Sequence, residues 1–232
     1  MKSVLVLQHI GCETLGTIGD ALARAGATPR HIRSFAGEPV PKTLGSAAGL
    51  IVLGGPQSVY DRERFPFLHD EIRLIEAALQ HDRPVLGVCL GSQLLAATLG
   101  APVTRGRQKE IGWFDITLTK AARADALFAG VPRQFTGFHW HGDVFELPAG
   151  AVALAASART PIQAYRYSNH AYGLLFHLEV TGPQIAEMVT LFADELHASH
   201  ANPRAILAGT NQQLAALQTI GAQVYRAWTK LL

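Results

Sequence analysis

The sequence of 232 residues contains only two cysteines, Cys12 and Cys89, which lie far apart along the chain. A disulfide framework needs more cysteines, and a zinc site built from cysteine pairs needs them at short spacing. Neither feature therefore organises this chain. We expect both thiols to stay reduced in a soluble, cytoplasmic protein.

Charged side chains are also scarce. Lys and Arg number 20 and Asp and Glu number 18, so 16% of the residues are charged and the net charge is +2. Proteins that bind nucleic acids gather basic residues on one face. Here the densest basic run, residues 105–109, is followed at once by Glu110. We therefore predict that nucleic acid is not among the partners.

Long hydrophobic runs are absent as well. No stretch approaches the roughly 18 apolar residues that a transmembrane helix needs, so we expect no membrane association. The apolar run near the N-terminus, residues 4–7, is interrupted by Gln8 and His9. It is too short for the apolar region of a signal peptide and instead predicts a buried strand.

Hydrophobic residues make up 48% of the chain, enough for a large core. In the first half, short apolar runs alternate with amphipathic stretches, a pattern typical of a parallel sheet covered by helices. We predict an α/β fold, a three-layer sandwich with a central, mostly parallel sheet of flavodoxin-like type. The predicted strands are residues 3–8, 31–35, 50–53 and 84–88, and the predicted helices are residues 17–25, 67–79 and 90–99.

The second half changes character. Strand-like segments follow at residues 114–118, 151–156, 162–167 and 172–176, with turn residues between them. Capping-box patterns at Thr181–Gln184 and Thr210–Gln213 then predict helices over 182–197 and 214–228. We expect one domain over 1–181, with a C-terminal helical extension over 182–232 packed on it. The apolar stripe of the last helix could also be a dimer surface, so an oligomer is possible.

The most informative segment is Gly87–Gln93, where an apolar strand meets a glycine-flanked cysteine and then a helix. This strand–turn–helix context is that of a nucleophile elbow, with Cys89 at the turn. The flanking glycines, Gly87 and Gly91, permit a sharp turn and close backbone approach. A helix N-terminus would lower the pKa of the thiol. A buried structural cysteine at a tight turn is the alternative.

A base and an orienting group follow much later in the chain. The apolar run over 173–176 predicts a strand that ends at His177, with Glu179 two residues on. Side chains two apart in an extended chain point to the same side, so Glu179 can orient the His177 ring toward Cys89. Taken alone, the pair could equally be an edge histidine next to a glutamate at a helix entry.

A glycine loop, Leu53–Ser58, directly follows a predicted strand. Parallel strands end at one edge of the sheet, where ligands of such folds bind. A backbone N–H of this loop and that of Leu90 could together hold an oxyanion. No Gly-Lys-Ser/Thr follows, so the loop is not a Walker phosphate loop. An ordinary turn is the alternative.

Taken together, these three segments resemble the class I glutamine amidotransferases, the Cys-His-Glu glutaminases. Residues 109–113 and 139–143 further resemble the glutaminase part of GMP synthetase and its stand-alone relatives. The resemblance covers roughly residues 1–181. It implies that Cys89 attacks the glutamine side-chain amide to form a γ-glutamyl thioester, releasing ammonia and then glutamate, with His177 as acid and base and Glu179 as its orienting group.

The resemblance also implies the remaining site residues. Backbone N–H groups of Gly55 and Leu90 would form the oxyanion hole, and substrate would bind to Gly54, Gln93, His141, Gly142 and Asp143. No cofactor and no metal are expected, because His139 and His141 form a pair without an evident third ligand. Leu178 replaces the proline usual in the family. Its side chain should point away from the reacting groups.

Three functions remain open. The first is glutamine hydrolysis with an unknown ammonia acceptor, which could be a separate synthetase subunit because no ATP-using domain is evident. The second is a stand-alone hydrolase of γ-glutamyl peptides or amides that uses the same three residues. The third is a non-catalytic binding or regulatory protein of this fold. Intact Cys89, His177 and Glu179 argue against the third.

Overall fold

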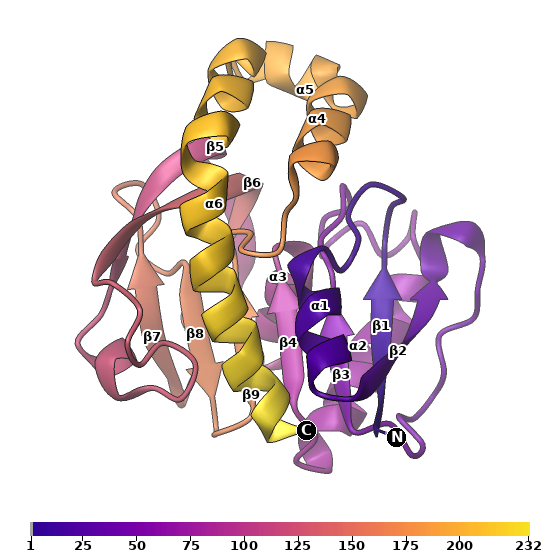
Figure 1. Ribbon diagram of the computed structural model, residues 1–232. Helices are drawn as coiled ribbons and strands as arrows, with labels where there is room; N and C mark the ends of the chain where they lie inside the picture. The colour runs from indigo at the N-terminus through magenta and orange to yellow at the C-terminus, as the bar shows by residue number, and fades with distance from the viewer. Residues whose placement is uncertain (1) are drawn as a thin grey trace.

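Residues 2–232, the part described by the computed structural model, form one mixed sheet with helices on both faces (Figure 1). Across this part of the chain the strand order is β2-β1-β3-β4-β9-β8-β7-β5-β6. The α/β class and the layered arrangement predicted from the sequence are confirmed. The strands are β1 Lys2–Gln8, β2 Ala27–Arg33, β3 Gly49–Val52, β4 Val85–Val88, β5 Val103–Leu118, β6 Gln134–Phe145, β7 Ala151–Ala156, β8 Ala164–Tyr167 and β9 Ala171–Leu174.

The sheet has a parallel half and an antiparallel half. Strands β2, β1, β3, β4 and β9 pair in parallel, whereas β9, β8, β7, β5 and β6 pair antiparallel. Every residue of β3 and β4 is buried, as expected of parallel strands covered on both faces. In the long strand β5 the first seven residues are exposed or half-buried and the buried ones lie further on, whereas β6 is buried continuously over residues 137–141.

Helices cover both faces of the sheet. Helices α1 (Thr17–Arg24) and α6 (Pro203–Trp228) lie against one face, and α2 (Phe67–Gln80) and α3 (Leu90–Thr98) belong to the core on the other. In α2, Leu68, Leu74, Ile75 and Ala78 are buried at helical spacing. Each core therefore joins one face of the sheet to its own pair of helices.

Two strand predictions need correction. The second strand was expected over 31–35 but runs over Ala27–Arg33, and residues 34–36 form a 3₁₀ turn. It is an edge strand that pairs only with β1, so it carries few buried residues and tolerates Pro29. In the second half, β5 extends well beyond the predicted 114–118, and β6 was not predicted as an element.

The C-terminal helices are α4 (Gly182–Leu191), α5 (Ala193–Ala198) and α6. The capping box predicted at Thr181 and Gln184 is confirmed, but the helix predicted to reach residue 197 is interrupted at Phe192. The second capping box, at Thr210–Gln213, is wrong. Helix α6 begins two turns earlier, because the Asn202 side chain accepts hydrogen bonds from the first turn and Pro203 occupies the first helical position.

The apolar stripe of α6 is part of the core. Leu217, Val224 and Trp228 are fully buried, and Figure 1 shows α6 crossing the whole face of the molecule. Packing on the sheet therefore accounts for this face of the helix. Among the described residues, no helix has the length and apolar character needed to cross a membrane.

Candidate active site

The predicted site residues come from loops at one edge of the parallel half. The segments that follow β1, β3, β4 and β9 all leave the sheet at its carboxyl edge, below α4 and α5 in Figure 1. Ligands of α/β sheets bind at this edge. The fold thus brings together four segments, of which the first and the last lie more than 160 residues apart in the sequence.

Cys89 lies at the turn between β4 and α3 with a backbone φ of 49°, a strained value for a residue other than glycine. The two flanking glycines explain how the turn fits. A Cβ on Gly87 would lie 2.4 Å from the carbonyl oxygen of Gly91, and a Cβ on Gly91 would lie 1.9 Å from that of Val52. Both positions therefore require glycine, and the elbow predicted from the sequence is present.

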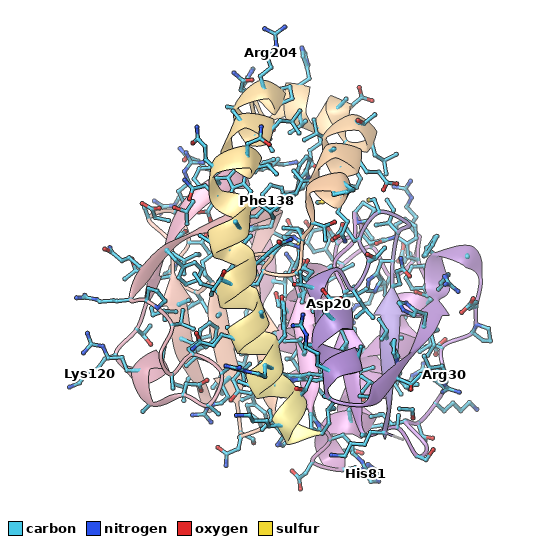
Figure 2. The ribbon with its side chains drawn as sticks, viewed as in Figure 1. Asp20, Arg30, His81, Lys120, Phe138 and Arg204 are labelled. Atoms are coloured by element: carbon cyan, nitrogen blue, oxygen red, sulfur yellow. The ribbon has the colours of Figure 1, made fainter. Side chains whose placement is uncertain are left out.

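His177 and Glu179 form a buried pair. Nδ1 of His177 lies 2.6 Å from Oε1 of Glu179, and the side chains are 1% and 6% exposed. The strand predicted to end at His177 instead ends at Leu174. His177 makes an isolated bridge in which its N–H donates to the carbonyl oxygen of Phe138 at 2.8 Å. Figure 2 shows Phe138 beneath α6, whereas Lys120 and Arg204 project outward.

The sequence reasoning missed Tyr225, which lies in α6. Its hydroxyl donates to Oε2 of Glu179 at 3.2 Å, so both carboxylate oxygens of Glu179 have a partner. Burial raises the pKa of Tyr225 well above 10, which keeps the hydroxyl a proton donor. A tyrosine about 50 residues away in the sequence gives no local signal. Tyr225 is not one of the apolar residues from which the last helix was predicted, so no sequence signal placed it in the core.

The segment around Glu179 is held from two sides. The N–H of Thr17, at the start of α1, donates to the Glu179 carbonyl oxygen at 2.9 Å. On the other side, α6 approaches so closely that a Cβ on Gly221 would lie 2.5 Å from the Leu178 carbonyl oxygen. The Leu178 side chain is fully buried in the core next to α6. The backbone between His177 and Glu179 is therefore fixed by helices from both ends of the chain.

Cys89 and His177 influence each other. Burial raises the pKa of the Cys89 thiol, and hydrogen bonding with His177 and its charge oppose the rise. The expected lowering by the helix N-terminus does not prevail, because the thiol is almost completely enclosed. Burial alone would lower the pKa of His177, but the charge of Glu179 and its hydrogen bond to the ring outweigh it and raise the pKa well above 6.5. In this structure the thiol donates to the Trp140 carbonyl oxygen at 3.4 Å, and Nε2 of His177 is buried without a hydrogen-bond partner among the described residues.

The glycine loop after β3 lies beside Cys89. A Cβ on Gly55 would lie 2.4 Å from Cβ of His9, so the loop packs tightly against the segment after β1. The His9 ring contacts the Gly54 carbonyl oxygen through Nδ1 and the Glu71 carboxylate through Nε2, at 3.1 and 2.8 Å. Leu90, as the first residue of α3, carries an N–H that the helix itself cannot satisfy. Gly55 lines the same cavity as Cys89, and Leu90 directly follows it in the chain, so their role as oxyanion donors stays a prediction.

A cavity of about 490 Å³ opens in front of Cys89. Of the predicted substrate-binding residues, Gln93, His141, Gly142 and Asp143 line it. The Asp143 carboxylate accepts hydrogen bonds from the hydroxyls of Ser58 at 2.8 Å and Tyr60 at 3.0 Å, while the Gln93 amide donates to the Asp143 carbonyl oxygen. Gly54 does not line the cavity. It lies against the Glu13 carboxylate and Cys89 instead.

The cavity has further charged walls that the sequence analysis did not assign. Glu195, from α5, accepts hydrogen bonds from the Lys109 ammonium at 2.5 Å and from the Trp140 indole N–H at 2.9 Å. Glu13, from the loop after β1, and Arg105 also line it. These residues belong to four separate elements, and only the folded arrangement of the sheet edge brings them together.

One cluster could hold a metal ion. Glu110, His139 and His141 each offer a ligand atom, and these atoms lie within 4.8 Å of one another. Glu110 is the third ligand that the sequence did not reveal; Asp143 points elsewhere. Burial lowers the pKa of His141 to about 3, so its ring is neutral. The oxygens of Glu110 already accept hydrogen bonds from Ser157, Thr160 and Gln163, so this carboxylate is satisfied without a metal.

Cys12 and Trp113 are not among the residues that line the cavity. Burial raises the pKa of the Cys12 thiol to about 11, with the charge of Glu13 adding to the rise, so this cysteine is a weak nucleophile. Trp113 does not reach the cavity. Its indole N–H donates to the Ile206 carbonyl oxygen in α6. Trp140, by contrast, lines the cavity.

The fold and the site define a class: α/β proteins with a cysteine on a strained strand-to-helix elbow, next to a buried His–Glu pair. Comparison with known protein families identifies the family within this class. The profile of the family "Glutamine amidotransferase class-I" matches residues 19–196. The chain belongs to this family.

Individual relatives agree with this assignment. The glutamine amidotransferase-like protein YfeJ of Salmonella typhimurium is 38% identical over 191 residues, which cover 81% of this chain and 80% of that protein. A GMP synthase of Latilactobacillus sakei is 35% identical over 162 residues, covering 65% of this chain but only 30% of the synthase. A glutamine amidotransferase of Thermotoga maritima superposes with a TM-score of 0.90 at 30% identity, over 99% of this chain and 98% of that one.

Proposed function

We propose that this chain is a glutaminase that hydrolyses the side-chain amide of glutamine to glutamate and ammonia. One observation carries the proposal. A cysteine on a strained elbow faces a 490 Å³ cavity, with a histidine behind it whose Nδ1 lies 2.6 Å from a buried glutamate. Nucleophile, base and orienting group are the three parts that covalent hydrolysis requires. The family membership supports the same chemistry.

In the proposed first step, His177 takes the thiol proton of Cys89, and the sulfur attacks the amide carbon of glutamine. The carbonyl oxygen becomes an oxyanion, which the N–H groups of Gly55 and Leu90 stabilise. His177 then gives its proton to the amide nitrogen. The C–N bond breaks, ammonia leaves, and a γ-glutamyl thioester remains on Cys89.

In the second step, His177 takes a proton from a water molecule, which attacks the thioester carbon. The C–S bond breaks, the thiol regains its proton from His177, and glutamate leaves. Glu179 keeps Nδ1 of His177 protonated and stabilises the charged ring. Gln93, His141, Gly142 and Asp143 would bind the amino-acid end of glutamine, with Asp143 next to the α-ammonium group. Gly54 would serve by leaving room beside Cys89. No cofactor takes part, and the ammonia acceptor would be a separate synthetase subunit or none.

A second candidate function is hydrolysis of γ-glutamyl peptides or amides through the same thioester. The size of the cavity favours it, because about 300–1,000 Å³ is typical of sites for ligands much larger than one amino acid. The cavity extends from Cys89 to Tyr60, Lys109 and Phe192. That length leaves room for a leaving group larger than ammonia.

The test uses the purified protein with glutamine and, separately, with γ-glutamyl dipeptides. Released ammonia or amine is measured, and mass spectrometry detects the covalent adduct on Cys89. Cys89→Ala should abolish both signals. Cys12→Ala is the matched control, since it removes another buried thiol at the same edge of the sheet, and it should keep both.

The outcomes separate the candidates. Turnover of glutamine alone supports the glutaminase, and turnover of dipeptides at a higher kcat/KM supports the second function. If the wild type turns over neither substrate and forms no adduct, both hydrolytic functions are wrong. Glutamine binding that survives Cys89→Ala, without turnover by the wild type, would instead indicate a binding protein of this fold.

A further inference from the structure

The Glu13 carboxylate is an unusual feature of the cavity wall. Its Oε2 atom is shielded from solvent and has no hydrogen-bond partner among the described residues. Leaving a buried charged or polar oxygen unpaired costs stability, so such a group needs an explanation. The residue lies in the loop between β1 and α1 and lines the same cavity as Cys89.

The other carboxylates around the reacting groups all have partners. Asp143 accepts from Ser58 and Tyr60, Glu195 accepts from Lys109 and Trp140, and Glu179 accepts from His177 and Tyr225. Glu13 is therefore the carboxylate whose oxygen is left free for a group that enters the cavity.

The position of Glu13 relative to the nucleophile is defined by Gly54. A Cβ placed on Gly54 would lie 1.9 Å from Oε2 of Glu13 and 3.3 Å from Cβ of Cys89. Oε2 and the Cβ of Cys89 thus lie on the same side of the Gly54 backbone, next to the space that a side chain at this position would fill. A side chain at position 54 would displace the Glu13 carboxylate, which explains why this residue is glycine.

The charge of His177 influences the pKa of Glu13. Burial raises the pKa of Glu13, and the charge of His177 is the strongest influence that lowers it. A carboxylate would repel the developing oxyanion and attract the N–H groups of the departing nitrogen, so Glu13 suits the nitrogen side of the scissile group. The oxyanion donors, Gly55 and Leu90, would occupy the carbonyl-oxygen side of the same scissile group.

We propose that Glu13 binds the leaving nitrogen: its Oε2 accepts an N–H hydrogen bond from the scissile carboxamide and orients that nitrogen for protonation by His177. This inference rests on the proposed function. It explains how the enzyme would prefer amide substrates to ester substrates. No proton is transferred to Glu13. The amide N–H supplies the partner that Oε2 lacks, and an ester has no such donor.

The experiment compares two substrates that differ only at the leaving group, glutamine and the γ-methyl ester of glutamate. Both form the same thioester, so hydrolysis of that thioester is common to them. Glu13→Gln should lower kcat/KM for glutamine by about 10-fold, because a neutral amide oxygen replaces the carboxylate as acceptor of the substrate N–H. For the ester, kcat/KM should change by less than about threefold.

Gly54→Ala provides a second variant that keeps the carboxylate but displaces it, since the new Cβ would occupy the position of Oε2. It should show the same selective loss for glutamine. Glu195→Gln is the matched control. It removes a charge from the same cavity at a carboxylate that already has partners, and it should affect both substrates alike.

Equal losses for amide and ester in Glu13→Gln, or no loss for either, would overturn the inference while leaving the proposed function intact. If the wild type hydrolyses neither substrate, the proposed function itself is wrong and this inference is wrong with it. Thermal unfolding of each variant distinguishes a selective kinetic effect from loss of the fold. If Glu13→Gln does not fold, Gly54→Ala decides the question on the same ratio of substrates.

Discussion

The parallel half of the sheet and the cavity wall opposite it contribute to the site in different ways. The parallel half places Cys89, His177 and Glu179 through backbone geometry, with glycines that no other residue could replace. The wall, built from β5, β6 and α5, contributes side chains such as Lys109, Asp143 and Glu195. Changes in the first region should therefore be close to all-or-none, and changes in the second should be graded.

The largest effect is expected for Gly91→Ala, in the parallel half. The new Cβ would lie 1.9 Å from the Val52 carbonyl oxygen, so β3 and α3 would have to separate. We expect the free energy of unfolding to fall by at least about 3 kcal/mol, measured by denaturant titration. Gly19→Ala is the control, because its Cβ would meet nothing closer than 3.7 Å. An equally small effect at both positions would contradict the tight elbow.

Glu179→Gln should have the next largest effect, on rate rather than on folding. Loss of the charge that stabilises the His177 ring should lower kcat by about 10²- to 10⁴-fold. In the wild type, the raised pKa of His177 places the acid limb of kcat/KM above pH 6.5, since protonation removes the base. The substitution removes the main cause of that rise, so the limb should move to lower pH. An unmoved limb in a pH–rate profile would argue against the pairing.

A graded effect is expected for Asp143→Asn, in the wall. If the carboxylate binds the α-ammonium of glutamine, KM should rise by about 10- to 100-fold with kcat little changed. The fold should be retained, because the amide oxygen still accepts from one of the two hydroxyls, of Ser58 or Tyr60, and the amide N–H can donate to the other. Steady-state kinetics with glutamine measure the split. A fall in kcat at constant KM would place Asp143 in the reaction rather than in binding.

The smallest effect is expected for Tyr225→Phe, which connects the C-terminal helix to the parallel half. It removes the hydrogen bond to Oε2 of Glu179 and leaves the packing of the ring in place. We expect kcat to fall by about fivefold, consistent with one hydrogen bond. The acid limb of the pH profile of kcat/KM should also shift. A purely structural defect would lower the rate without moving this limb. An unchanged profile would show that Glu179 needs no second partner.

The parts of the site that could be predicted are those with local signals. The elbow around Cys89 has a glycine pattern, and the His177–Glu179 pair depends on residues only two apart. Glu13, Glu110 and Tyr225 have no such signal, because the hydrogen-bond partners of Glu110 and Tyr225 lie 46 to 53 residues away and Oε2 of Glu13 has none among the described residues. Their positions depend on sheet order and helix packing, which single-sequence patterns do not specify.

The same distinction applies to the fold. Buried parallel strands were predicted because burial on both faces leaves a continuous apolar run in the sequence. Amphipathic helices such as α2 were predicted because burial of one face leaves a helical period. The edge strand β2 was misplaced because it buries few residues, and β6 was missed although its histidines alternate. Helix α6 was shortened at its start because Thr210 imitates a cap, while Asn202 and Pro203 provide the real one.

The contact between Tyr225 and Glu179 has a consequence for the order in which the site forms during synthesis. Cys89, His177 and Glu179 are synthesised before α6, which supplies the tyrosine and the close approach of Gly221 to the Leu178 backbone. A chain still emerging from the ribosome lacks both supports for the His–Glu pair. The His–Glu pair therefore gains these two supports only once α6 has been made and has docked on the sheet.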